Sequence, residues 1–181
     1  PHVVGGLGKH VTELAPALAG QATAYGPISI DLYTPLYSGG EPVERVSEHL
    51  TIHRVEVPPL DPQDNYNSVI SCNNFLADAA EAEVAAGSAH EPYDLIHVHD
   101  WLVTRAGVKL KQDWHTPLLT TIHATERGRH RGYTPGETSY QIDRTEWLGC
   151  FEAWRVVACS QFMSQELQNF FELPADKVTV I

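Results

Sequence analysis

The apolar residues in the first third of the chain predict one helix followed by two strands. Leucine, valine and alanine recur at helical spacing between Leu7 and Ala19, which is typical of an amphipathic helix. Residues 28–34 (ISIDLYT) form a short apolar run, and residues 50–57 (LTIHRVEV) alternate between apolar and polar, so both predict strands. Between them, the glycines and prolines of residues 36–45 predict a loop.

The rest of the chain predicts a long helix and then a repeated strand–helix pattern. Prolines in residues 58–62 exclude regular structure, and the alanine-rich residues 67–86 are typical of a helix ended by Gly87. Short apolar runs then alternate with helical segments. The predicted strands are residues 94–98, 117–122, 155–159 and 178–181, and the predicted helices are residues 101–114, residues 139–154 and a helix capped by Ser160 that ends near Phe171. This alternation predicts a parallel sheet, and the expected fold is a doubly wound, Rossmann-like α/β domain.

One domain over residues 1–181 is the expected organisation, since this length can bury a full core. Doubly wound domains begin with a strand that feeds the first turn. Here a glycine turn at Gly5 opens a helix with no predicted strand before it. We therefore expect the first strand of the fold to lie upstream of residue 1.

Composition narrows the class of protein. The 12 basic and 23 acidic residues give a net charge of −11, which disfavours a nucleic-acid partner. The apolar runs are too short to cross a bilayer, and no basic segment followed by an apolar stretch opens the sequence. The three cysteines, Cys72, Cys150 and Cys159, are an odd and sparse set without a CxxC pair. This pattern indicates reduced thiols in a cytoplasmic protein without a structural zinc, and Cys159 is expected in the core.

The first candidate site is the glycine-rich segment GGLGKH at the start of the predicted first helix. Gly5, Gly6 and Gly8 would let the backbone approach a ligand closely, and unpaired amides at a helix N-terminus attract anions such as a diphosphate. The segment matches neither the Walker A pattern nor the dinucleotide-binding pattern. A tight turn that only packs the helix on a sheet is the alternative.

The second candidate is the segment HVHDW, at the end of the predicted strand 94–98. His97 and His99 are two apart and project to the same side of a strand, which could suggest a metal. No carboxylate and further histidine stand at a matching spacing, so metal binding is disfavoured. Asp100 is expected to cap the helix that begins at Trp101 while it faces the cleft at the strand ends.

The third candidate is the segment TIHATERGRH, residues 121–130, which begins at the end of the predicted strand 117–122 and continues into a polar loop. A dense run of charge directly after a buried strand is typical of a ligand site. His123 stands at the strand tip. Arg127, Arg129 and Arg131 are candidates for a phosphate-bearing or sugar acceptor, with ordinary solvated arginines as the alternative.

These motifs, in this order and together with EWLGCFEAWRVVACSQFM, resemble the retaining glycosyltransferases of the GT-B architecture. The similarity is to the family 4 group and to the related bacterial glycogen and starch synthases, and it runs through nearly the whole chain. The resemblance implies two Rossmann-like lobes around a cleft. This chain would be the N-terminal, acceptor-side lobe, and the whole C-terminal donor-binding lobe would lie outside it.

The resemblance also implies roles for individual residues. Backbone amides at Gly5, Gly6 and Gly8 would lie near the diphosphate of a nucleotide-sugar donor. His123 would contact the transferred hexose, Asp100 would order the cleft or contact the acceptor, and Arg127 would lie on the acceptor side. No metal or other cofactor is expected. The whole protein would act on an ADP-, UDP- or GDP-sugar and a carbohydrate acceptor, and copies of this lobe could self-associate through the exposed cleft face.

Two departures favour a broader family 4 role over a synthase. The synthases have a lysine before the two glycines, where Val3 and Val4 stand here, and Lys9 follows the last glycine. The histidine-led loop also lacks the asparagine that is usual in synthases. Two other readings stay open: a non-catalytic α/β domain that binds an anion or a protein partner, and, with less support, a metal-dependent hydrolase built on His97 and His99.

Overall fold

A computed structural model describes residues 5–36, 40–87 and 93–181. The chain divides into two compact units, Pro1–Val57 and Pro58–Ile181. Each unit is described by itself below. Residues 1–4, which include the two valines before the glycine segment, lie outside the described part.

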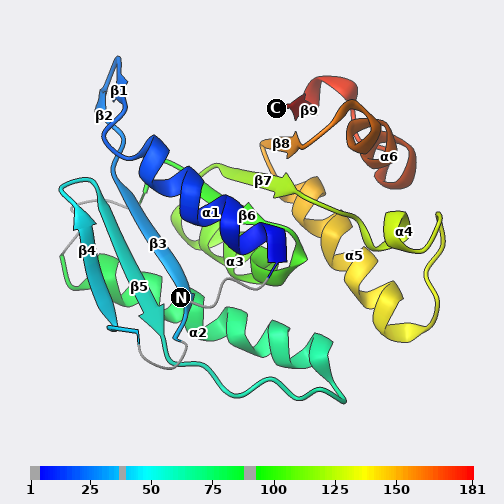
Figure 1. The fold of residues 1–181 in the computed structure, drawn as a ribbon, viewed down its shortest axis with the longest axis horizontal. Helices are drawn as coiled ribbons and strands as arrows, with labels where there is room; N and C mark the ends of the chain where they lie inside the picture. Colours follow the sequence, from blue (N-terminus) through cyan, green and yellow to red (C-terminus); the bar gives the residue numbers. More distant parts are fainter. Residues whose placement is uncertain (1–4, 37–39, 88–92) are drawn as a thin grey trace. The chain divides into compact units, whose positions relative to one another are not determined.

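The first unit contains one helix and a small mixed sheet (Figure 1). Strands β3 and β5 are parallel in the register Ile30 to Leu50, and β4 is antiparallel to β5. The strand order is therefore β3-β5-β4. A two-stranded hairpin of β1 and β2 stands apart from this sheet. The elements are α1 (Gly5–Leu18), β1 (Ala22–Thr23), β2 (Gly26–Pro27), β3 (Ile30–Pro35), β4 (Val43–Ser47) and β5 (Leu50–Val55).

The predictions for this unit miss β4 and the short β1–β2 hairpin. The predicted first helix and both predicted strands are present, with bounds that differ by up to two residues. The loop predicted over residues 36–45 is wrong from Val43 onward, and its residues 37–39 lie outside the described part. All five residues of β4 are exposed. Because the strand has no buried face, an apolar pattern in the sequence does not predict it. Its pairing with β5 creates it.

The second unit is a four-stranded parallel sheet with its connecting helices (Figure 1). The strand order β6-β7-β8-β9 follows the chain, and every neighbouring pair is parallel. The elements are α2 (Asn65–Ala85), β6 (Ile96–His99), a 3₁₀ turn η1 (Trp101–Val103), α3 (Thr104–Trp114), β7 (Leu118–Ile122), α4 (Glu126–Arg129), α5 (Glu137–Glu152), β8 (Arg155–Ala158), α6 (Gln161–Phe171), a 3₁₀ turn η2 (Ala175–Lys177) and β9 (Val178–Val180). The predicted alternation of strands and helices is confirmed, and so is the α/β fold class.

Two helix starts in this unit show why the elements begin where they do. The Ser160 hydroxyl accepts a hydrogen bond from the Met163 amide at 3.1 Å, which confirms the predicted cap of α6. The Asp64 side chain accepts from the Asn67 amide at 3.4 Å and caps α2. The short helix α4 was not predicted, because its four residues, three charged residues and a glycine, carry no apolar periodicity.

The main core lies on one face of the parallel sheet. Alternate strand residues point into it, and side chains from α3, α5 and α6 complete it. The buried members are Val98, Val108, Leu118, Ile122, Cys150, Ala153, Val156, Ala158, Leu167, Phe171 and Leu173. Gly107 on α3 lets that helix approach β6 closely, since a Cβ there would lie 2.4 Å from Cγ1 of Val98. No described helix is long and apolar enough to cross a membrane.

Candidate functional site at the carboxyl ends of the strands

Three neighbouring strands of the second unit end side by side and deliver one polar residue each. Asp100 follows β6, His123 follows β7, and Cys159 follows β8. The register pairs His99 with Thr121 and Ile122 with Ala158, so the three residues lie at the same edge of the sheet. Ligands of open parallel sheets bind at this edge.

His123 is held at its backbone and contacted on both sides of its ring. Its amide donates to Oδ1 of Asp100 at 2.7 Å. Its Nε2 lies 3.1 Å from Nδ1 of His99, so one ring donates and the other accepts. Its Nδ1 lies 3.7 Å from Sγ of Cys159. This predicted site residue therefore stands at the strand tip in a defined orientation.

Asp100 has a strained backbone and a buried carboxyl group. Its φ of 54° and ψ of −167° belong to a region that residues other than glycine rarely adopt, and such strain collects at functional sites. Burial raises the pKa of the Asp100 carboxyl, while the hydrogen bond from the His123 amide and the charges of His123 and Arg129 oppose that rise. The predicted helix cap is wrong, because the side chain makes no cap hydrogen bond and binds the His123 amide instead.

Glu146 on α5 is a part of this region that the sequence did not indicate. Its side chain is completely buried. The Glu126 amide donates to both carboxyl oxygens of Glu146, at 3.1 and 2.8 Å. Burial raises the pKa of Glu146 to about 8, and the hydrogen bond from the Glu126 amide and the charge of Arg129 act in the opposite direction. A glutamate in a helix of mixed polarity gives no sequence signal of such burial.

The three arginines after β7 differ in how they are engaged. Arg127 forms a two-point ion pair with buried Asp143, with Nε to Oδ1 at 2.7 Å and Nη2 to Oδ2 at 2.9 Å. Arg129 lies 3.5 Å from Oε2 of Glu126. Arg131 is exposed. The guanidinium of Arg127 is thus occupied within the protein, and its expected acceptor role stays a prediction.

A concavity of about 660 Å³ adjoins the segment that follows His123. Arg129 and Arg131 contribute positive charge to its wall, and Glu166 contributes a carboxylate. Exposed Phe162 adds an aromatic surface. The remaining lining residues are Ala124, Thr125, Gly128, Gly132, Met163 and Phe170. The wall of this hollow thus combines charged side chains with an exposed aromatic ring.

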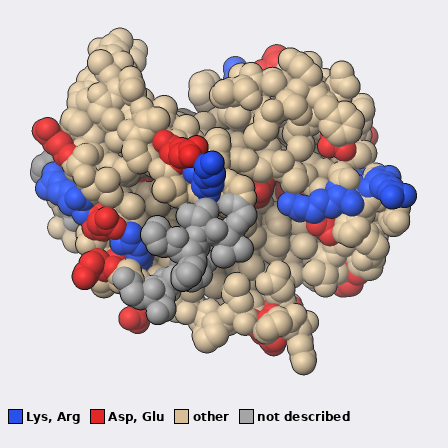
Figure 2. Space-filling model, in the orientation of Figure 1, with Lys and Arg blue, Asp and Glu red and all other residues tan. Residues whose placement is uncertain are grey.

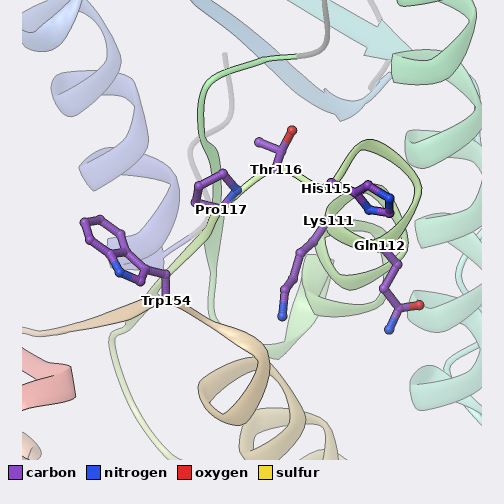
Figure 3. Close-up of a pocket in the computed structure, with 6 residues that line it drawn as sticks. All are labelled: Lys111, Gln112, His115, Thr116, Pro117 and Trp154. Carbon is purple, nitrogen blue, oxygen red and sulfur yellow. The ribbon is translucent and has the colours of Figure 1, made fainter.

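A second concavity, of about 580 Å³, lies at the opposite end of the strands (Figure 3). Pro117 precedes β7 and Trp154 precedes β8, so this hollow is at the amino edge of the sheet. Figure 3 shows Trp154 on one side of Pro117 and Thr116, with His115 and Lys111 on the other. The Lys111 ammonium is engaged by the carboxylate of Glu152 at 2.6 Å. Nothing in this set of residues matches a predicted site.

The two histidines of β6 lie close to each other, and the glycine segment lies in the first unit. His97 and His99 project from the same side of β6, as expected, and their ring centroids are 4.3 Å apart. The His97 Nε2 lies 2.8 Å from the Thr121 hydroxyl. In the first unit, α1 begins at Gly5, so the three glycines of the predicted diphosphate site, Gly5, Gly6 and Gly8, fall in its first turn. Apart from its chain neighbours and the backbone of its own helix, no described atom lies within 4 Å of a Cβ built on Gly6.

The three cysteines differ in burial, and charged side chains of both signs lie on the surface. All three cysteines are free, as predicted, but Cys159 is exposed at the strand end, so its expected place in the core is wrong. Alternation along β8 explains this, because its core residues are Val156 and Ala158, and Cys159 comes directly after the strand ends. On the face drawn in Figure 2, basic side chains are scattered among acidic and uncharged ones.

A strained aspartate and a fixed histidine at the carboxyl edge of a parallel sheet are typical of ligand-binding α/β domains. Residues 4–181 match Glycosyltransferase Family 4. The chain belongs to this family. This agrees with the resemblance of its glycine and histidine motifs.

Individual relatives and structures agree with this assignment. The chain is 31% identical to a glycogen synthase of Mycobacterium tuberculosis and 25% identical to a D-inositol 3-phosphate glycosyltransferase of Thermobifida fusca. The alignments cover 100% and 98% of this chain, and 45% and 40% of those relatives. A sucrose-phosphate synthase of Thermosynechococcus elongatus has the same fold, with a TM-score of 0.72 and 19% identity over 98% of this chain and 42% of that one. The chain thus spans less than half the length of these relatives.

Proposed function

We propose that this chain is the acceptor-side lobe of a retaining hexosyltransferase. The whole protein would move a hexose from an ADP-, UDP- or GDP-sugar to a carbohydrate acceptor, in the manner of a glycogen synthase. Membership of Glycosyltransferase Family 4 supports the reaction class. The observation that carries the proposal for this chain is the fixed position of His123, whose amide is bound by a strained, buried Asp100.

Each site residue takes a distinct part in this proposal. His123 contacts the hexose as its bond to the diphosphate breaks, and Asp100 keeps His123 in place. First-turn amides of α1, at Gly5, Gly6 and Gly8, stabilise the charge that develops on the leaving diphosphate. Because these amides serve the diphosphate, the reaction would need no metal or other cofactor. Its rate should then be unchanged by a chelator.

The acceptor side is proposed at the concavity beside the segment after His123. Arg127 was the residue expected there, but its ion pair with Asp143 leaves Arg129 and Arg131 as the arginines on the wall of the hollow. A sugar ring could contact the Phe162 ring while its hydroxyls bind Arg131 and Glu166. The names of the relatives include both glycogen and phosphorylated acceptors, so both kinds belong in the test.

The test uses the full-length protein from the parent gene. It is incubated with ADP-, UDP- and GDP-glucose, with and without a glucan or a sugar phosphate, and nucleotide release is recorded. We expect acceptor-dependent release with one donor, and a loss of at least about 100-fold for His123→Ala because the hexose loses a positioning contact. His49→Ala is the matched control, since His49 belongs to the first unit, directly before β5, and its ring Nδ1 lies 3.1 Å from the Ser29 hydroxyl.

Failure of release with every donor, from a folded protein, would reject the transferase proposal in favour of a non-catalytic domain that binds an anion or a protein partner. Two further expectations are tested separately. A cytoplasmic location is tested by fractionation of cells that express the full-length protein. Self-association through the cleft face is tested by sedimentation over a range of concentrations, where a monomer throughout would reject it.

A further inference from the structure

The segment between β7 and α4 is anchored by carboxyl groups at both of its ends. At the start of this segment, the His123 amide donates to Asp100. At its end, the Glu126 amide donates to both carboxyl oxygens of Glu146. Asp100 comes from the end of β6 and Glu146 from α5, so two different elements fix four consecutive residues, 123–126.

Burial of the Glu146 carboxyl group is unfavourable for folding, which indicates that this residue does more than fill space in the core. Glu146 is completely buried, and transferring a carboxyl group out of water is unfavourable unless hydrogen bonds replace its hydration. The bonds it receives come from one amide, and the nearest basic group, Nη1 of Arg129, lies 3.9 Å from its Oε1. An apolar residue of similar volume would often be as stable at such a position.

A second feature shows that the anchor acts on the start of α4. The Thr125 hydroxyl accepts from the Gly128 amide at 2.9 Å and caps this short helix. Glu146 accepts from the amide of Glu126, the first residue of the helix. Amides in the first turn of a helix have no partner within it, so these two side chains together hold the turn that follows His123.

We propose that Glu146 is a positioning residue for the glycosyl transfer assigned above. It touches no substrate and acts through the Glu126 amide, which keeps His123 in line with the transferred hexose. The role rests on the proposed function. One physical consequence is independent of that function. The amide of Glu126 should be protected from hydrogen exchange with solvent only while Glu146 offers an acceptor oxygen.

Two variants of the full-length protein separate this role from simple packing. Glu146→Gln keeps an acceptor oxygen for the Glu126 amide. Glu146→Leu keeps the approximate volume and removes the acceptor. We expect kcat to fall about ten- to hundredfold in the leucine variant, with KM for the nucleotide sugar changed less than threefold, and kcat to stay within about threefold of the wild type in the glutamine variant. Glu152→Leu, on the last residue of the same helix, is the control and should leave kcat unchanged.

Hydrogen exchange at the Glu126 amide is measured on the same proteins. We expect faster exchange in Glu146→Leu and nearly unchanged exchange in Glu146→Gln. Unchanged exchange in the leucine variant, or a wild-type kcat in that variant, would overturn the positioning role. If the wild type shows no transfer with any donor, the proposed function fails, and the exchange result still decides whether Glu146 holds the segment. Equal loss in both variants, with equal unfolding temperatures below wild type, would assign Glu146 to packing alone.

Discussion

The two ends of the parallel sheet in the second unit differ in how deeply their charged groups are buried. At the carboxyl end, Asp100 and Glu146 are buried acids, and burial raises the pKa of each. At the amino end, the Lys111–Glu152 pair is 31% and 22% exposed and reachable by solvent. Solvated pairs of that kind add little to stability and cost little to build.

This comparison shows which end of the sheet contains features that are unfavourable for folding. Buried carboxyl groups and a positive φ at Asp100 are each unfavourable for folding, and they converge on one segment, residues 123–126. At the amino end of the same strands, His115 also has a positive φ of 56°, in the left-handed conformation that ends α3, but no buried carboxyl group is found among the described residues there. This convergence favours the carboxyl end as the place of the proposed site, in agreement with the general rule for ligand sites in open parallel sheets.

The largest effect is expected from Asp100→Ala, which removes the acceptor for the His123 amide and keeps the strained backbone. We expect kcat for nucleotide release to fall about 100-fold or more, because the reacting region loses one of its two anchors. Asp100→Asn keeps an acceptor oxygen and should lose less. The measurement is steady-state nucleotide release by the full-length protein.

A matched change at the other end gives the contrast. Glu152→Ala breaks the Lys111 pair at the amino edge and should change kcat less than twofold. An equal loss in both variants would contradict the functional distinction between the two ends. It would indicate that each change acts through general destabilisation.

The second effect concerns the pH dependence of stability and uses Glu146→Gln. Folding raises the pKa of Glu146 from 4.5 to about 8. The neutral form is thus favoured in the folded state, so its contribution to stability is fully present below pH 4.5 and is lost as the pH rises through 8. Glutamine does not titrate. The variant should gain on the wild type between pH 5 and pH 9, on the order of a few kcal/mol.

The midpoint of urea unfolding at pH 5, 7 and 9 measures this gain for the variant and the wild type. Glu152→Gln serves as the control, because Glu152 pairs with Lys111 at the surface and should give a difference that is nearly constant with pH. A constant difference for Glu146→Gln would show that Glu146 is ionised in the folded protein at every pH tested.

The sequence predicted the fold of this chain better than the interior of its site. Apolar runs predicted β6, β7 and β8, and the position of Asp100 and His123 directly after two of these runs indicated that they are site residues. Both signals are local in the chain. The helix cap expected at Asp100 was predicted wrongly, since a cap and an amide partner 23 residues away look the same in sequence, and its expected part in ordering the cleft stays a prediction. Glu146 was missed because its burial depends on the packing of α5, and Arg127 was assigned to the acceptor without knowledge of its pair with Asp143.

The smallest effect is expected from the thiol at the carboxyl end, and it reports on the charge of that end. Cys159 is exposed, whereas Cys72 and Cys150 are buried, so native protein should be alkylated by iodoacetamide at Cys159 and at the other two only on unfolding. Burial and the charge of Asp100 raise the pKa of the Cys159 thiol. Because the thiolate is the reactive form, alkylation should be slower than that of a free cysteine at pH 7 and should still be rising above pH 9.

Peptide mapping by mass spectrometry measures this rate at the Cys159 peptide. Asp100→Asn removes the neighbouring negative charge and should speed the reaction by a few fold at pH 8, whereas Glu152→Gln should leave it unchanged. Cys159 lies 3.7 Å from Nδ1 of His123, so a rate at pH 7 above that of a free cysteine would mean that a positively charged His123 stabilises the thiolate. That outcome would mean that the charge of His123, and not that of Asp100, sets the reactivity of the Cys159 thiol.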